Sequence, residues 1–369
     1  MHYTIKNEIF KAAEEVFILK AISIERLEPG MTLARTVTNS DMIIILSEGT
    51  ILTNAHITKL QTLDVPVVYI KDDFDLSQNY QQASAVLQKN KAFSHDFEVV
   101  SKYADEVFES LKDGQIPKEQ TQKVAAHILP MADNSGTIDY LFSLGHRSTT
   151  LALHSERVAI LSGILAKWMH FGWEEIRTVV TAAFLHDVGK VNFPDTILDK
   201  DPDSLEEEDL KIYQKHCQDG ADLLKKGGFN DTIQKVALSH HEKMNGSGFP
   251  NTLTGDKIPP YARIVAVADT YDNLTSERAG EIKRTPFYAV SYFVREIYSS
   301  LDPVVCVPLL TRIKDSLIGS RVTLSNGHKG IVAMYPNDFS ALPIISLDDG
   351  GNINLNNAQN VSITQYEPI

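Results

Sequence analysis

The sequence predicts a mainly α-helical protein, with a helical bundle between a small N-terminal α+β module and a small C-terminal β appendage. Three observations support this fold class. Apolar residues recur at steps of three and four through residues 141–317, as on the buried face of a helix. Short runs rich in Val and Ile, separated by Gly, Pro and Asn, occupy residues 21–70. Similar runs return after Gly319, where two of them flank an Asn-Gly turn.

The chain is expected to divide into four segments. Residues 1–75 form an N-terminal α+β regulatory module, residues 76–140 a helical connector, residues 141–317 the main helical domain, and residues 318–369 a β-rich appendage. This division follows the changes in apolar periodicity along the chain.

Local signals place the helices of the first two segments. A short amphipathic helix is expected over residues 1–20, and another from Asn54 to Leu63. Gly114 and Pro117 are expected to break the connector into separate helices, and the Asp-Asn-Ser-Gly run at residues 133–136 to form a loop.

The composition limits the classes of function. The 369 residues are enough for two or three domains, and 43% hydrophobic with 22% charged residues is typical of a globular protein. A net charge of −13 argues against binding to long nucleic acid, whereas a small anionic ligand needs only a few local cations. Two cysteines provide neither a disulfide framework nor a Cys-rich metal motif. Because we find no signal peptide and no apolar run long enough to span a membrane, we expect a cytoplasmic protein.

Five consecutive helices of the main domain are expected to bring metal-ligand side chains to the interior. In the first, His154 leads an apolar stripe through Val158 and Leu161, and each later helix repeats this arrangement. Successive ligand positions are separated by about 24 to 32 residues, roughly one helix plus its loop. The side chains concerned are His154, His186, Asp187, His216, His240, His241, Asp269 and Asp272.

A metal centre explains this pattern better than a set of ordinary core residues. A single histidine on an apolar face is more often a satisfied core residue than a ligand, but five of the 12 histidines follow one pattern here. Imidazole and carboxylate without thiolate suit Fe, Mn, Ni or Zn, and the ligands are too many for one ion with an open position. Asp187, next to His186 at the end of an apolar run, is expected to bridge two ions.

These motifs resemble those of the HD-GYP family, a branch of the HD metal-dependent phosphohydrolases. The resemblance covers about residues 140 to 317 and depends most on the specific loop after His240-His241, which contains Gly246-Ser247-Gly248-Phe249-Pro250. It also includes His186-Asp187-Val188-Gly189-Lys190 and Asp269-Thr270-Tyr271-Asp272. It implies an HD-type helical bundle, two divalent ions with Fe or Mn before Ni or Zn, and hydrolysis of the bacterial second messenger cyclic di-GMP, or a related cyclic dinucleotide, to the linear dinucleotide or GMP.

The resemblance also implies roles for single residues. The metal ligands of the family fall on His154, His186, Asp187, His216, His240, His241 and Asp269. Asp187 and Lys190 fall on catalytic positions, and Lys190 would contact the scissile phosphate. The positions that contact the substrate are Lys190, Asn245, Gly248, Phe249, Asp272 and Arg278.

The chain departs from the family pattern in three places. Asn245 and Phe249 stand where the family has Asp and Tyr, and Ala-Gly-Glu at residues 279–281 replaces Pro-Tyr-Lys. Thr150 stands where some members carry a glutamate that binds a third ion. A threonine is neutral and often bonds back to its own helix, so we expect a two-metal centre.

Some assignments leave alternatives open. Lys190 could cap the end of a helix, and Phe249 could be a core aromatic residue. Glu242 is expected to support one of the histidines. For the whole protein, a catalytically weak cyclic dinucleotide sensor and another HD-type nucleotide phosphohydrolase remain alternatives to the phosphodiesterase. A homodimer is possible.

Overall fold

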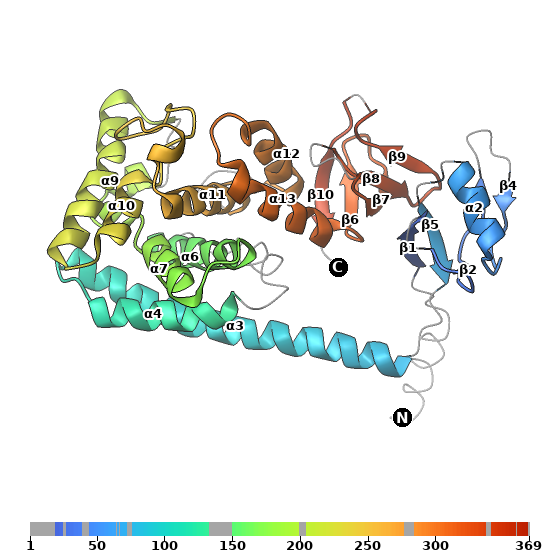
Figure 1. The fold of residues 1–369 in the computed structure, drawn as a ribbon, viewed down its shortest axis with the longest axis horizontal. Helices are drawn as coiled ribbons and strands as arrows, with labels where there is room; N and C mark the ends of the chain where they lie inside the picture. Colours follow the sequence, from blue (N-terminus) through green and yellow to red (C-terminus); the bar gives the residue numbers. More distant parts are fainter. Residues whose placement is uncertain are drawn as a thin grey trace, which may run out of the picture.

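The computed structural model describes residues 19–24, 27–38, 44–63, 65, 67–71, 76–132, 150–198, 204–276, 284–336, 341–358 and 360–367. The fold is mainly helical, with a small α+β part near the N-terminus and a β-sheet near the C-terminus, as predicted (Figure 1). The expected loop at residues 133–136 lies outside the described residues. So does the expected helix over residues 1–20, except for its last two positions, which begin strand β1.

The N-terminal part combines short strands with one helix. Its elements are β1 (Leu19–Ser23), β2 (Thr32–Leu33), β3 (Val37–Thr38), β4 (Ile44–Leu46), α2 (Asn54–Thr62) and β5 (Val67–Lys71). Strand β5 lies between β1 and β2 and is antiparallel to both, whereas β3 pairs with β4. The predicted helix is confirmed as α2, and Thr53 caps it by accepting a hydrogen bond from the amide of His56. A small core around Leu33, Leu60 and Val68 holds this part together.

The connector is helical and breaks where the sequence predicts. Helix α3 (Leu76–Lys112) ends before Gly114, which has a positive φ of 76°, and α4 (Lys118–Met131) begins after Pro117. Helix α3 runs along the length of the molecule in Figure 1. From Phe93 onward its buried face belongs to the main hydrophobic core, which also includes α4.

The main helical domain surrounds one buried helix. Its elements are α6 (Leu151–Trp168), α7 (Trp173–Phe184), η3 (Val188–Lys190), α8 (Asp195–Leu198), α9 (Glu207–Lys226), α10 (Asp231–Ser239), η5 (Gly255–Lys257), α11 (Pro260–Thr275), α12 (Pro286–Glu296) and α13 (Pro303–Leu317). Helix α6 packs against α3, α4, α7, α11 and α13, and most of its side chains are buried. Within the described ranges, no helix is both long and apolar enough to cross a lipid bilayer.

One sequence expectation about this domain needs correction. His186, His240 and His241 were expected on helices, but α7 ends at Phe184 and α10 ends at Ser239. The three histidines therefore follow the last helical turn instead of lying within it. The last carbonyl groups of a helix have no intrahelical partner, and this position places them within reach of the imidazole rings.

The C-terminal part is a five-stranded antiparallel sheet in the order β10-β6-β7-β8-β9. Its strands are β6 (Arg321–Leu324), β7 (Lys329–Met334), β8 (Ile344–Leu347), β9 (Asn352–Asn354) and β10 (Ile363–Glu367). The hairpin around Asn326-Gly327 is confirmed, and Gly327 has a φ of 87° that a turn of this kind requires. Apolar residues of the sheet, including Val322, Val332 and Ile345, continue the main core.

Candidate metal centre

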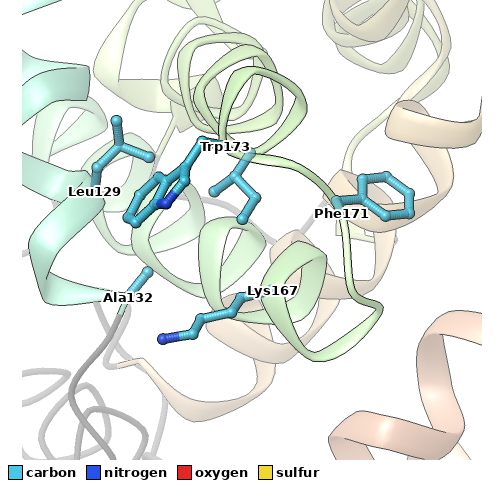
Figure 2. A pocket seen from close by; sticks show the side chains of 6 residues that line it. Leu129, Ala132, Lys167, Phe171 and Trp173 are labelled. Carbon is cyan, nitrogen blue, oxygen red and sulfur yellow. The ribbon is translucent and has the colours of Figure 1, made fainter.

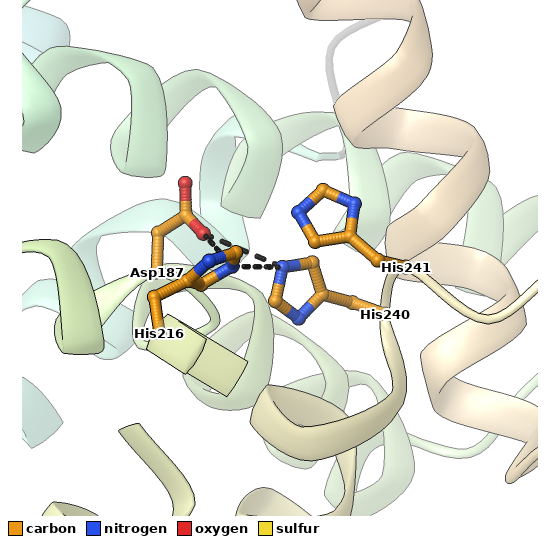
Figure 3. Close-up of side chains that lie close together, drawn as sticks. All are labelled: Asp187, His216, His240 and His241. Carbon is orange, nitrogen blue, oxygen red and sulfur yellow. Dashed lines mark hydrogen bonds and ion pairs between the residues drawn. The ribbon is translucent and has the colours of Figure 1, made fainter. Parts of the chain in front are cut away.

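The predicted ligand side chains come together as two neighbouring groups. One group contains Asp187, His216, His240 and His241, and the other contains His154, His186 and Asp269. Within each group the ligand atoms all lie within 4.8 Å of one another. Figure 3 shows the first group, in which the rings of His216 and His240 face the Asp187 carboxylate. His154 and His241 are half-buried, and the other ligands are buried.

Backbone carbonyls fix the orientation of three of the histidines. His186 Nδ1 donates to the Ala183 carbonyl at 2.6 Å, His240 Nδ1 to the Ala237 carbonyl at 2.9 Å, and His216 Nδ1 to the Tyr213 carbonyl. Each acceptor lies three residues before its histidine. Because Nδ1 carries the proton in these bonds, Nε2 presents a lone pair to the interior. This is the arrangement in which protein histidines bind metal ions.

Several hydrogen-bond acceptors of the candidate metal centre lie close together without a proton between them. His216 Nε2 and His240 Nε2 lie 3.3 Å apart, and each lies 3.3 Å from Asp187 Oδ1. Asp187 Oδ1 and His186 Nε2 are buried, and neither makes a hydrogen bond. Buried acceptors without a donor are unfavourable, and a divalent cation is the group that would satisfy all of them together. The donor set therefore fits metal ions.

Asp187 joins the two groups. Its Oδ1 faces His216 and His240, whereas Oδ2 lies 3.4 Å from His186 Nε2 and 3.6 Å from His154 Nε2. Lys190 Nζ donates to Oδ2 at 2.7 Å. Burial opposes ionisation of Asp187, but the Lys190 ammonium and the surrounding imidazoles outweigh it, and the pKa of the carboxyl lies well below its usual range. Asp187 thus offers one charged oxygen to each group.

Asp272, whose expected contact with substrate stays a prediction, is bound by two protein side chains. Its Oδ1 accepts from Arg157 Nε at 2.7 Å, and its Oδ2 accepts from Arg157 Nη2 at 3.0 Å and from His154 Nδ1 at 2.8 Å. The side chain is buried, and both oxygens are already used. Asp272 therefore orients His154, whose Nε2 points to Asp269 Oδ1 at 3.1 Å.

The loop that follows His241 is organised by Glu242, which also differs from expectation. The Glu242 carboxylate accepts from the amides of Asn251 at 2.7 Å and Leu253 at 2.8 Å, and thereby holds the loop, so the expected contact with a histidine is wrong. Asn245 is exposed, and its Oδ1 accepts from the amide and hydroxyl of Ser247. Asn245 therefore bonds to another residue of the same loop.

Two further loop positions differ in what they offer to a ligand. Gly248 is buried, and a Cβ there would lie 2.4 Å from the His241 carbonyl oxygen, so packing of the loop requires glycine. The ring of Phe249 lies over His241 with ring centroids 4.7 Å apart, and it is half-buried. Phe249 is therefore the loop side chain that faces the metal-ligand groups. Arg278, the remaining expected substrate contact, lies outside the described residues.

Comparisons with known proteins agree with this geometry. A family model described as "HD domain" matches residues 143–305. The cyclic di-GMP phosphodiesterase response regulator RpfG of Xanthomonas campestris is 39% identical over 160 residues, which are 42% of each chain. The HDG"Y"P protein Bd1817 of Bdellovibrio bacteriovorus is 19% identical, with a TM-score of 0.51 over 79% of this chain and 98% of that one. Residues 143–305 form an HD domain of the HD-GYP family.

Other relatives of the HD-GYP domain differ in the substrate that their names give. The 3'3'-cGAMP-specific phosphodiesterase 2 of Vibrio cholerae is 40% identical over 135 residues, which cover 36% of this chain and 26% of that protein. The chain thus spans less than half the length of either of these two curated relatives.

Two residues of the HD-GYP domain were not singled out from the sequence. Arg157 lies one turn after His154 on α6, and its burial beside Asp272 depends on how α6 packs against α11. Tyr213 lies one turn before His216 on α9, and its hydroxyl is 3.3 Å from Lys190 Nζ. A spacing of three residues from a candidate ligand was the available signal in both cases.

A separate apolar hollow lies away from the metal-ligand groups. It has a volume of about 300 Å³ and is lined by Leu129, Ala132, Lys167, Phe171, Trp173 and Ile176 (Figure 2). None of its lining residues is one of the candidate ligands. The hollow therefore shares no residue with the candidate metal centre.

The histidines predict that acid destabilises the metal-free HD-GYP domain. Burial lowers the pKa of His186 and of His216 to about 4, and it lowers the pKa of His241 well below its usual value. An unfolded histidine titrates near about 6.5. Below that pH the unfolded chain binds more protons than the folded chain, so the free energy of unfolding should fall from about pH 6.5 to 4.

The pKa of His154 is shifted in the opposite direction. Burial lowers its pKa, but the Asp269 and Asp272 carboxylates outweigh burial and raise it to about 9. Its stabilisation is present below about pH 6.5 and is lost as the pH rises through 9. Thermal unfolding of chelated protein, followed by circular dichroism from pH 4 to 10, should show a maximum near neutrality. His216→Gln should flatten the acid side, and the exposed His328→Gln should not; an unchanged melting temperature between pH 7 and 4.5 would contradict the prediction.

Proposed function

We propose that the protein is a metal-dependent phosphodiesterase that hydrolyses cyclic di-GMP or a related cyclic dinucleotide. The observation that carries this proposal is the pair of ligand groups joined by the two oxygens of Asp187. Two divalent ions held there would lower the pKa of a bound water and bind the non-bridging oxygens of a phosphodiester. Among relatives of known substrate, the named proteins act on cyclic di-GMP or 3'3'-cGAMP.

The chain itself supplies charge and orientation. Asp187 is ionised and lies between the two groups, and the backbone carbonyls and Asp272 hold the imidazoles in fixed orientations. Lys190 keeps its ammonium next to Asp187, where the fixed charge can stabilise negative charge that develops on a phosphoryl oxygen. Asp187 and Lys190 are therefore proposed as catalytic residues. Capping of a helix is not needed to explain Lys190, because its Nζ is bonded to Asp187.

We further propose two ions per chain, Fe or Mn, since imidazole and carboxylate ligands suit both. His154, His186 and Asp269 would hold one ion, and Asp187 with His216, His240 and His241 would hold the other. Thr150 is exposed and caps α6, with Oγ1 accepting from the Leu153 amide at 3.2 Å, so it offers no ligand for a third ion. Burial raises the pKa of the Cys217 thiol beside His216, which argues against a thiolate ligand.

Metal analysis tests the number of ions. We expect two divalent ions per chain in protein purified anaerobically with Fe or Mn, because the donor atoms form two groups. Elemental analysis and anomalous diffraction would provide the count and the positions. Thr150→Glu is the matched variant, since it adds a carboxylate one turn before His154. Three fully occupied positions in the unmodified chain would contradict the two-ion proposal.

Turnover tests the substrate. The protein loaded with Fe or Mn is expected to convert cyclic di-GMP to the linear dinucleotide or GMP, and chromatography distinguishes these products. The same assay with 3'3'-cGAMP measures the preference between cyclic dinucleotides. Binding without turnover under anaerobic loading would favour a sensor, and turnover of only mononucleotides would favour another HD-type phosphohydrolase.

Other features of the whole protein stay predictions. One is the division of the chain into four segments at residues 75, 140 and 317. The hydrophobic core that α3 and α4 share with the main helical domain favours treating the connector and that domain as one unit. A homodimer is another. Cytoplasmic localisation is proposed because both cysteines, Cys217 and Cys306, are buried free thiols, as suits a reducing compartment.

A further inference from the structure

Tyr213 lies beside the metal-ligand groups and has no part in the proposed function so far. Its hydroxyl lies 3.3 Å from Lys190 Nζ and 3.5 Å from His241 Nε2. Its ring contacts Phe249, with centroids 6.3 Å apart, and Lys190 Nζ lies 4.7 Å from the ring centroid. The backbone carbonyl of the same residue orients His216. Tyr213 thus connects Lys190, the first ligand group and the loop aromatic.

The hydrogen bonds of this hydroxyl can be accounted for. The Lys190 ammonium has only donors, so the Tyr213 oxygen accepts from it. The Tyr213 proton must then find a separate acceptor. Within the described ranges that acceptor is His241 Nε2, at a distance near the limit for a hydrogen bond.

Metal binding removes this acceptor. His241 belongs to the first ligand group, and its Nε2 lone pair is unavailable to Tyr213 once it binds an ion. The hydroxyl then points its proton into the space beside that ion without a partner from the described chain. Tyr213, His241 and Phe249 are all half-buried, whereas His216 and His240 are buried, so this is an open side of the centre.

We propose that Tyr213 is a substrate-binding catalytic residue, whose hydroxyl donates a hydrogen bond to a phosphoryl oxygen held at the first ligand group. This inference rests on the proposed phosphodiesterase function. A metal-bound phosphodiester presents oxygens with negative charge, and these are the acceptors that the hydroxyl lacks. Phe249, on the loop that faces Tyr213, has no hydroxyl. The hydroxyl that donates to the phosphoryl oxygen is therefore that of Tyr213 on α9. Lys190 donates to the Tyr213 oxygen and thereby favours donation of the tyrosine proton to the substrate.

The test compares Tyr213→Phe with the unmodified chain, both loaded with Mn. The variant keeps the ring and the backbone carbonyl that orients His216. Titration calorimetry with inorganic phosphate should give at least about tenfold weaker binding for the variant, because a hydrogen bond to a charged group is lost. Hydrolysis of bis(p-nitrophenyl) phosphate and of cyclic di-GMP should both slow by about tenfold to a hundredfold. Tyr298→Phe, which removes a hydroxyl from a side chain that is 77% exposed, is the control.

Three results would overturn the inference. The first is equal phosphate affinity in Tyr213→Phe and the unmodified chain. The second is loss of Mn from Tyr213→Phe in elemental analysis, which would assign the hydroxyl to the metal centre instead of the substrate. The third is absence of phosphate binding by the unmodified Mn-loaded chain. If that chain binds phosphate and cleaves bis(p-nitrophenyl) phosphate but no cyclic dinucleotide, the proposed substrate is wrong, while the phosphate comparison still decides the role of Tyr213.

Discussion

Asp187→Ala is expected to abolish phosphodiester hydrolysis and to reduce bound metal to at most one ion per chain. Asp187 supplies an oxygen to each ligand group, so its removal takes a charged ligand from the first group and a negative charge from beside the second. The first group would then contain only neutral imidazoles, which are weaker ligands for Fe or Mn than a set with a carboxylate. Lys190 would also lose the carboxylate that its buried ammonium contacts.

The variant Asp187→Asn separates charge from shape, since the amide keeps the size of the side chain. We expect it to lose turnover as completely as the alanine variant, because an amide is a poor bridging ligand. Elemental analysis and chromatography of cyclic di-GMP measure both effects. Asp219→Ala, which removes a partly exposed carboxylate of α9 that pairs with Lys215, should change neither. Retention of two ions and turnover in Asp187→Asn would show that Asp187 does not bridge.

The positions of the candidate ligands could be predicted because they depend on local spacing. His154, His216 and Asp269 each lie on the apolar stripe of their own helix, and burying that stripe brings the ligand inward whatever the neighbouring helices are. The same holds for the Asn326-Gly327 hairpin, whose turn chemistry is contained in two residues. Local patterns of this kind can be interpreted from the sequence without knowledge of tertiary packing.

The residues around the ligands could not be predicted in the same way. Glu242 was expected to support a histidine, but its carboxylate binds amides nine and eleven positions later, which only the folded loop brings near. Tyr213 and Phe249 belong to different elements, and their contact depends on how that loop packs on α9. Strand β10, with mixed polar residues in Ile363–Glu367, has little strand signal of its own and forms by pairing with β6.

The contacts of Asp272 could not be predicted from its position in the sequence, because they depend on tertiary packing. The resemblance placed Asp272 among the substrate contacts, and in the structure its carboxylate accepts hydrogen bonds from Arg157 and His154. The pKa of Asp272 is held below its usual range, since the Arg157 guanidinium and the His154 hydrogen bond outweigh burial. A buried carboxylate paired in this way is expected to stay ionised, which suits the task of orienting an imidazole.

Arg157→Leu is expected to destabilise the fold by about 3 to 5 kcal/mol and to release the ion held by the second ligand group. Arg157 is 2% exposed, and its guanidinium donates two hydrogen bonds to Asp272. Leucine leaves the Asp272 carboxylate buried without its cation, so the carboxylate takes up a proton or draws one from His154. Either change disturbs the orientation of His154 toward Asp269. Loss of such a partner typically weakens metal affinity about tenfold to a hundredfold.

A double-mutant cycle distinguishes this account from a general loss of packing. Arg157→Leu combined with Asp272→Asn removes both charges, so the pair should be less unstable than the sum of the single variants predicts. Urea unfolding gives the stabilities, and elemental analysis gives the metal content. The exposed Arg177→Leu, which breaks an ion pair with Glu174 on α7, should cost at most about 0.5 kcal/mol. The first ligand group shares no hydrogen bond with Arg157 among the described residues, so one ion should remain in every variant. Additive losses in the cycle, or equal loss of both ions, would assign Arg157 to packing alone.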